Sequence, residues 1–131
     1  VCTDKKKCIF GEAGKPNKYG KIAEECLNKI PAIYHRIYVD KYVIMPNHIH
    51  AIIVIEDAEE KEISLTHIVG QYKMSVTKEI HKKDQNLKIW QRSFYDHIIR
   101  NQQDYERIWL YIHKNTKKWK DDCYYEALDA C

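Results

Sequence analysis

Two histidines stand one residue apart in the segment YVIMPNHIHAIIVIE, residues 42–56, which otherwise has the composition of a buried strand. Side chains two positions apart on a strand point to the same face, so His48 and His50 should lie side by side. Two neighbouring imidazoles can converge on one divalent cation, although a lone His-x-His motif is more often a hydrogen-bonded pair without metal. The pair therefore marks a candidate metal site. Surface or packing roles are expected for His81, His97 and His113.

A second group of reactive side chains lies in NQQDYERIWLYIHKNTKKW, residues 101–119. Its apolar residues recur at helical spacing, and Asn101 or Asp104 could cap the helix. Tyr111 and Asn115 are four residues apart, so a helix would place both on one face. A tyrosine hydroxyl can act as a covalent nucleophile once it is activated. Other tyrosines remain alternatives for that role: Tyr95, Tyr105 (on nearly the opposite helical face), Tyr124 and Tyr125.

Hydrophobic periodicity and turn residues predict the elements that position these side chains. Each predicted strand is rich in β-branched and aromatic residues, and each predicted helix carries an apolar stripe. The first predicted elements are a turn-rich connection over 11–20 that could form a small hairpin and a helix over 19–29 that Pro31 ends. Two strands follow, over 32–45 and 48–55, separated by Pro46 and Asn47. The last elements are a helix from Ser64 or Thr66 to about 81–83, an extended segment over 89–100 with a strand at 94–99, and the C-terminal helix.

This order predicts an α+β fold, namely a ferredoxin-like antiparallel sheet with helices on one face plus a C-terminal helix that carries Tyr111. A chain of 131 residues can build one hydrophobic core, so residues 1–131 should form a single domain. The chain begins abruptly in an apolar segment at Val1, and we expect it to lack part of the first strand.

Charge and cysteine content narrow the class of protein. The formal net charge of +3 permits binding to nucleic acid without requiring it, and the lysines could equally form a solvated face. The five cysteines are odd in number and include no Cys-x-x-Cys pair, which argues against a disulfide framework and favours a reducing cytoplasm. No run of 18 apolar residues is present, so we expect no membrane span.

The motifs MPNHIHAIIVI, WQRSFYDHIIR and YIHKNTKKW, in this order, resemble those of REP-associated tyrosine transposases, which belong to the HUH superfamily of single-strand endonucleases. The resemblance extends from VCT at the N-terminus to Trp119. It implies that His48 and His50 bind a metal, that Asn115 completes the metal site, and that Tyr111 is the nucleophile. The chain departs from the family pattern at Thr116, where a proline usually follows the asparagine.

The resemblance also implies a function. The protein would be a nucleoid-associated bacterial enzyme of the cytoplasm that cleaves and rejoins single-stranded DNA near hairpins. It would use a 5′-phosphotyrosine intermediate and Mg²⁺ or Mn²⁺, and would act as a monomer or a homodimer. A non-catalytic module that binds structured single-stranded DNA is the alternative. Five cations are expected to border the DNA groove: Lys73, Lys78, Arg92, Lys117 and Lys118.

Overall fold

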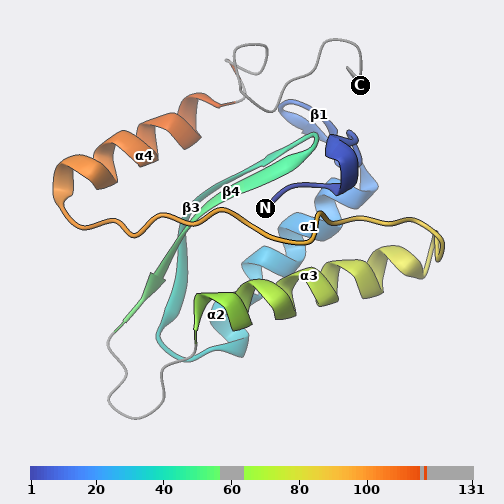
Figure 1. The fold of residues 1–131 in the computed structure, drawn as a ribbon, viewed down its shortest axis with the longest axis horizontal. Coiled ribbons are helices and arrows are strands. Elements are labelled where there is room, and N and C mark those ends of the chain that lie inside the picture. The colour runs from blue at the N-terminus through green and yellow to red at the C-terminus, as the bar shows by residue number, and fades with distance from the viewer. Residues whose placement is uncertain (57–63, 116, 118–131) are drawn as a thin grey trace.

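The fold is described here for residues 1–56, 64–115 and 117 of a computed structural model, and Figure 1 shows how its elements are arranged. Two antiparallel ribbons and four α-helices make up most of it. In chain order the elements are η1 (Asp4–Lys6), β1 (Gly11–Glu12), β2 (Lys15–Pro16), α1 (Lys18–Asn28), α2 (Ile30–Ile33), β3 (Ile37–Met45), β4 (His48–Ile55), α3 (Leu65–His81) and α4 (Gln102–Lys114).

A sheet built on β3 and β4 forms the centre of the fold. The two strands pair antiparallel across the tight connection at Pro46 and Asn47. Val1 exchanges two backbone hydrogen bonds with Ile49 on the free edge of β4, at 3.0 and 2.8 Å. Isolated antiparallel bridges then join Cys2 to His48 and Thr3 to Trp90. The resulting order is β3, β4, residues 1–3 and residue 90, which is the strand order of a ferredoxin-like sheet and confirms the predicted fold class.

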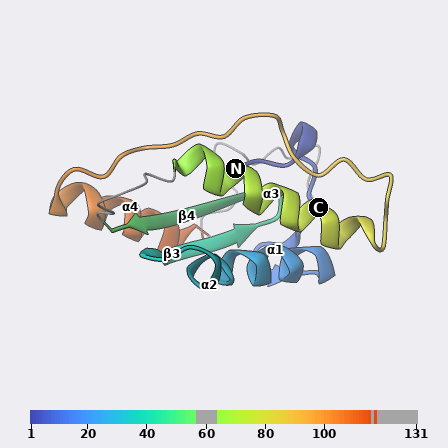
Figure 2. The same cartoon turned by 90° about the horizontal axis from the view of Figure 1, so that it is seen from below.

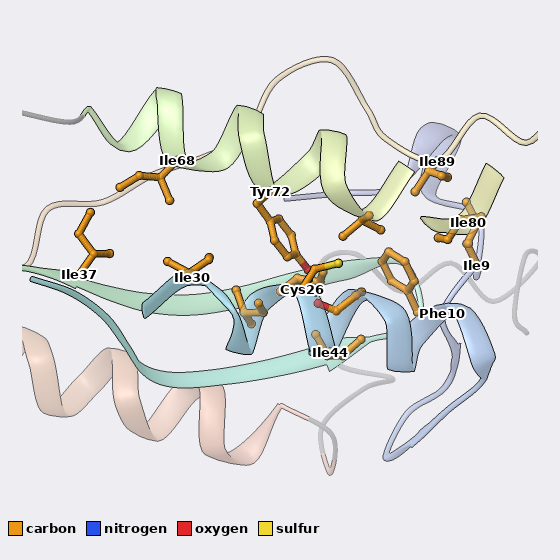
Figure 3. Close-up of a cluster of buried hydrophobic side chains, with 14 residues drawn as sticks. Ile9, Phe10, Cys26, Ile30, Ile37, Ile44, Ile68, Tyr72, Ile80 and Ile89 are labelled. Atoms are coloured by element: carbon orange, nitrogen blue, oxygen red, sulfur yellow. Dashed lines mark hydrogen bonds between the residues drawn. The ribbon is translucent and has the colours of Figure 1, made fainter. Parts of the chain in front are cut away.

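The helices divide between the two faces of this sheet. Helices α1 and α3 pack on one face, while α4 lies on the side of the β3–β4 ribbon away from them (Figures 1 and 2). Alternation along the strands explains this arrangement, because the pairs Ile44–Ile49 and Tyr42–Ala51 point into the α1–α3 core. Figure 3 shows the core, whose labelled members are Ile9, Phe10, Cys26, Ile30, Ile37, Ile44, Ile68, Tyr72, Ile80 and Ile89.

Short polar side chains begin the three long helices. The Asn17 side chain accepts hydrogen bonds from Tyr19 N and Gly20 N at the start of α1. Ser64 caps α3 by accepting from His67 N at 3.1 Å. Asn101 caps α4 in the same way, from Asp104 N at 2.8 Å. These caps satisfy amide groups that have no partner inside the helix. Of the two caps predicted for each helix, Ser64 rather than Thr66 begins α3, and Asn101 rather than Asp104 begins α4.

Three sequence-based expectations need correction. Residues 94–99 form no strand, because no neighbouring strand in the described residues pairs with them, and Tyr95 on this segment is 84% exposed. Strand β3 begins at Ile37 rather than at residue 32, since residues 30–33 form the short helix α2, and the missing N–H of Pro31 costs nothing in its first turn. Cys8 is disulfide-bonded, whereas Cys2 and Cys26 are free thiols. The small hairpin over 11–20 is present as β1 and β2.

No helix in the described ranges is long and apolar enough to cross a membrane.

Gly20 on α1 lies against Phe10 and Pro16, and this close contact gives a testable prediction. A Cβ atom at position 20 would overlap the Phe10 carbonyl oxygen and approach Pro16 Cβ to 2.7 Å. We therefore expect Gly20→Ala to lower the free energy of unfolding by about 1–3 kcal/mol. Gly70→Ala is the matched control, because nothing lies within 4 Å of its added methyl group and α3 would gain up to about 1 kcal/mol. Urea denaturation measures both, and equal stability of the two variants would contradict this account.

Candidate active site

The strand β4 presents both histidines on the face of the sheet that meets α4. His48 pairs with Met45 and His50 with Val43, and these residues alternate with the core-facing Ile49. The two rings lie edge to face, with centroids 4.6 Å apart. His48 is 1% exposed, and the Nε2 atoms of both imidazoles are buried. The predicted same-face arrangement of His48 and His50 is therefore present in the fold.

Asn47 sets the orientation of the first imidazole. The amide nitrogen of Asn47 donates to the Lys6 carbonyl oxygen at 3.3 Å, so the other amide atom is the oxygen. That oxygen accepts a 2.7 Å hydrogen bond from Nδ1 of His48. A neutral His48 must then carry its proton on Nδ1 and its lone pair on the buried Nε2. This is how a neighbouring group orients a metal-binding histidine. Sequence reasoning missed the role of Asn47, although it directly precedes the His-x-His motif.

Helix α4 brings Tyr111 to the histidine pair. The Tyr111 ring lies edge to face with the His50 ring, at a centroid distance of 5.3 Å. Tyr111 remains 47% exposed, so a large substrate can reach it. Asn115 lies one turn further along, at the C-terminal end of α4, and its Oδ1 is buried. Residues 48, 50, 111 and 115 thus come from two elements far apart in the sequence, and the tyrosine helix packs on the sheet of its own chain.

The described alternative tyrosines are placed differently. The hydroxyl of Tyr105 donates a short hydrogen bond to the Asp40 carboxylate, which raises the pKa of Tyr105 above its usual value and disfavours the phenolate. Tyr95 lies in the irregular segment before α4. A raised pKa disfavours Tyr105 as a nucleophile. Tyr124 and Tyr125 lie outside the described residues.

An ion-pair network holds the start of α4. Asp104 accepts a 2.7 Å hydrogen bond from Nε2 of His97 and a 2.5 Å hydrogen bond from Arg107. These partners, His97 first, lower the pKa of the Asp104 carboxyl. The network joins the segment before the helix to its first turn and is largely exposed to solvent. His97 therefore has a surface role, one of the two roles predicted for it.

His81, His113 and Trp90 also have structural contacts. His81 donates to the Leu87 carbonyl oxygen at 2.8 Å, and His113 stacks on Trp109. Trp90 is half-buried, donates to the Lys73 carbonyl oxygen at 3.1 Å, and packs near Phe10 and Tyr72 at the edge of the core.

The predicted DNA-binding cations occupy several elements. Lys73 on α3 donates to the carbonyl oxygens of Gln91 and Ser93, at 2.9 and 3.3 Å, and so fastens the segment after α3. Lys78, Arg92 and Lys117 are exposed. Lys118 lies outside the described residues.

The histidine pair and the asparagine fit a divalent cation. Two imidazole nitrogens and an amide oxygen, all buried, form a mixed donor set. Imidazole suits transition metals, and amide oxygen suits harder cations such as Mg²⁺ and Mn²⁺. The part of the chain that the structure describes contains no cluster of three or more His, Cys, Asp or Glu side chains suited to a metal. The candidate site is therefore the set of His48, His50 and the Asn115 amide.

Comparison with known proteins identifies the family and several relatives of this chain. The family model described as "Transposase IS200 like" matches residues 2–115. An uncharacterized protein of Haemophilus influenzae is 31% identical over 95% of this chain and 82% of its own length. A candidate REP-associated tyrosine transposase of the same organism is 29% identical over 57% of this chain and 47% of its own length.

A solved structure of a REP-associated tyrosine transposase bound to a REP hairpin has the same fold, with a TM-score of 0.70 and 20% sequence identity. The alignment covers 91% of this chain and 64% of that one.

The match over residues 2–115 shows that the chain belongs to the IS200-like transposase family. The resemblance to REP-associated tyrosine transposases that the motifs indicated is confirmed.

Proposed function

We propose that the protein cleaves and rejoins single-stranded DNA beside a hairpin, through a covalent bond between Tyr111 and a 5′ phosphate. The observation that carries the proposal is the contact between Tyr111 and His50, with His48 beside it, on two elements 61 residues apart in the chain. A nucleophile and two cation ligands on one surface are the groups that phosphodiester transfer needs.

In the proposed reaction the Tyr111 hydroxyl oxygen attacks the scissile phosphorus. The bond between phosphorus and the 3′ oxygen breaks, and the 3′ oxygen gains a proton to balance the one that the tyrosine loses. The products are a 5′-phosphotyrosine and a free 3′ hydroxyl. Because the phosphotyrosine keeps the energy of the broken bond, a second 3′ hydroxyl can displace Tyr111 and rejoin the DNA without ATP.

His48, His50 and Asn115 would hold the cation, Mg²⁺ or Mn²⁺. When bound, this ion polarises the phosphate and orients it for attack. Asn47 contributes by holding the His48 ring with its lone pair on Nε2. The partial burial of the site limits access of water to the ligands, while the exposed Tyr111 ring remains accessible to DNA.

The DNA partner is proposed to be a hairpin with a single-stranded flank, as in the REP hairpin complex of the structural relative. Lys78, Arg92, Lys117 and Lys118 are proposed to contact phosphates. Lys73 is the weakest member of the predicted set, since backbone carbonyl groups already accept hydrogen bonds from its ammonium group. Affinity should fall as salt rises, because phosphate contacts release counterions.

Incubation of the purified protein with labelled single-stranded oligonucleotides and Mn²⁺ tests the proposal. The oligonucleotides should carry a REP-type hairpin and a single-stranded flank. A denaturation-resistant protein–DNA adduct together with a free 3′ hydroxyl supports the transferase. Salt-sensitive retention of the hairpin with no cleavage in either Mn²⁺ or Mg²⁺ would instead identify a binding module and overturn the catalytic proposal.

A further inference from the structure

A β-bulge in β3 changes which side chains face α4. Val39 pairs with Ile53 and Lys41 with Ile52, so Asp40 is an extra residue opposite no partner. In a regular strand Lys41 would share the face of Val39, which packs against the α1–α3 core. The bulge shifts the register by one residue, and both Asp40 and Lys41 reach the helix on the other face.

The side chains of Asp40 and Lys41 contact one row of side chains along α4. Tyr105, Trp109 and His113 lie at four-residue intervals, one above the other. Asp40 accepts the hydrogen bond from Tyr105. The Lys41 ammonium group lies 4.2 Å from the centre of the Trp109 ring and donates to Nδ1 of His113 at 3.1 Å.

The aromatic part of this row is itself packed. The Trp109 and His113 rings stack with centroids 4.9 Å apart and planes at 19°. We call Asp40, Lys41, Tyr105, Trp109 and His113 the clasp. It joins β3 to about two turns of α4 through a hydrogen bond, a cation–π contact and a stacked pair.

The clasp and the nucleophile lie on opposite flanks of the helix face that meets the sheet. Ile112, which is buried, lies at the centre of this face. Tyr111 and Asn115 lie on one side of Ile112, and the clasp residues lie on the other. A helix held only along its centre can roll, and a roll about Ile112 would move Tyr111 relative to His50.

We propose that the bulge residues Asp40 and Lys41, through the clasp, fix the rotation of α4 and thereby position Tyr111 at the histidine pair. This inference rests on the proposed function of Tyr111. The clasp residues are positioning residues, because they would act on the reaction through the placement of α4. Displacement of a reacting group by about 1 Å can cost about a hundredfold in rate, so a small roll is enough to matter.

The experiment compares Lys41→Met, Tyr105→Phe and Lys41→Arg with the wild type. Its probe is a single-stranded oligonucleotide carrying a REP-type hairpin, in the presence of Mn²⁺. Lys41→Met and Tyr105→Phe should slow single-turnover formation of the Tyr111 adduct by roughly tenfold, while the hairpin Kd stays within about twofold. Lys41→Arg keeps a cation over Trp109 and should therefore form the adduct at close to the wild-type rate. Tyr38→Phe is the control, because it removes an exposed hydroxyl from the same strand.

Amide hydrogen exchange gives a second readout that does not depend on activity. Lys41→Met should speed exchange in α4 and leave α3 unchanged. The proposal would be overturned if the Lys41→Met and Tyr105→Phe variants had both the adduct rate and the α4 exchange rate of the wild type. It would also be overturned if these variants lost adduct rate, hairpin affinity and thermal stability in parallel. If the wild type forms no adduct, the proposed function fails. The exchange data then decide separately whether the clasp holds α4.

Discussion

Tyr111→Phe should abolish formation of the covalent protein–DNA adduct and lower the cleavage rate by at least about a thousandfold. The substitution removes one oxygen atom and leaves the ring that packs against His50. Because the ring is 47% exposed, loss of its hydroxyl leaves no polar cavity in the core, and the fold should be retained. Hairpin affinity should also be retained, since phosphate contacts supply most of it.

The matched control for this prediction is Tyr95→Phe, which removes a hydroxyl from a tyrosine that is 84% exposed. It should form the adduct at the wild-type rate. Mass spectrometry of the digested wild-type adduct should place the nucleotide on Tyr111. Assignment of the nucleotide to Tyr105 or Tyr95, or cleavage by the Tyr111→Phe variant, would refute the role of Tyr111.

His48→Ala and His50→Ala should each reduce cleavage by at least about a hundredfold, with little change in hairpin affinity. Each variant removes one of two imidazoles whose buried Nε2 atoms belong to the candidate metal site. Loss of a group that orients a metal ligand typically lowers metal affinity or activity 10- to 100-fold. Loss of the ligand itself should lower metal affinity at least as much. Isothermal titration with Mn²⁺ alone should therefore show weaker binding, independently of any assay of cleavage.

His35→Ala is the control, because His35 is exposed and lies before β3, away from the site. It should bind Mn²⁺ and cleave DNA as the wild type does. Buried His48 also packs in the fold, so His48→Ala could lose stability, and thermal unfolding must be measured alongside. His50 is only half-buried, and a His50→Ala variant that folds, binds Mn²⁺ normally and cleaves at the wild-type rate would contradict the metal site.

Local sequence signals were sufficient for most secondary structure. The caps at Ser64 and Asn101 and the break at Pro46 and Asn47 depend on residues close together in the chain, so they could be predicted without tertiary information. The segment at 94–99 shows the limit of this reasoning. Its β-branched and aromatic composition favours a strand, but a strand needs a neighbour, and none in the described chain pairs with it.

The sequence by itself determined which side chains make up the candidate site. Strand alternation put His48 and His50 on one face, and helical spacing put Tyr111 and Asn115 on one face. Only the tertiary structure brought these two faces together in one chain, with the Tyr111 ring 5.3 Å from that of His50. The bulge at Asp40 likewise could not be predicted from the sequence, because a bulge depends on the register between two strands and not on either strand alone. That one-residue shift points Lys41 at α4 instead of the core, and so decides how the tyrosine helix is held.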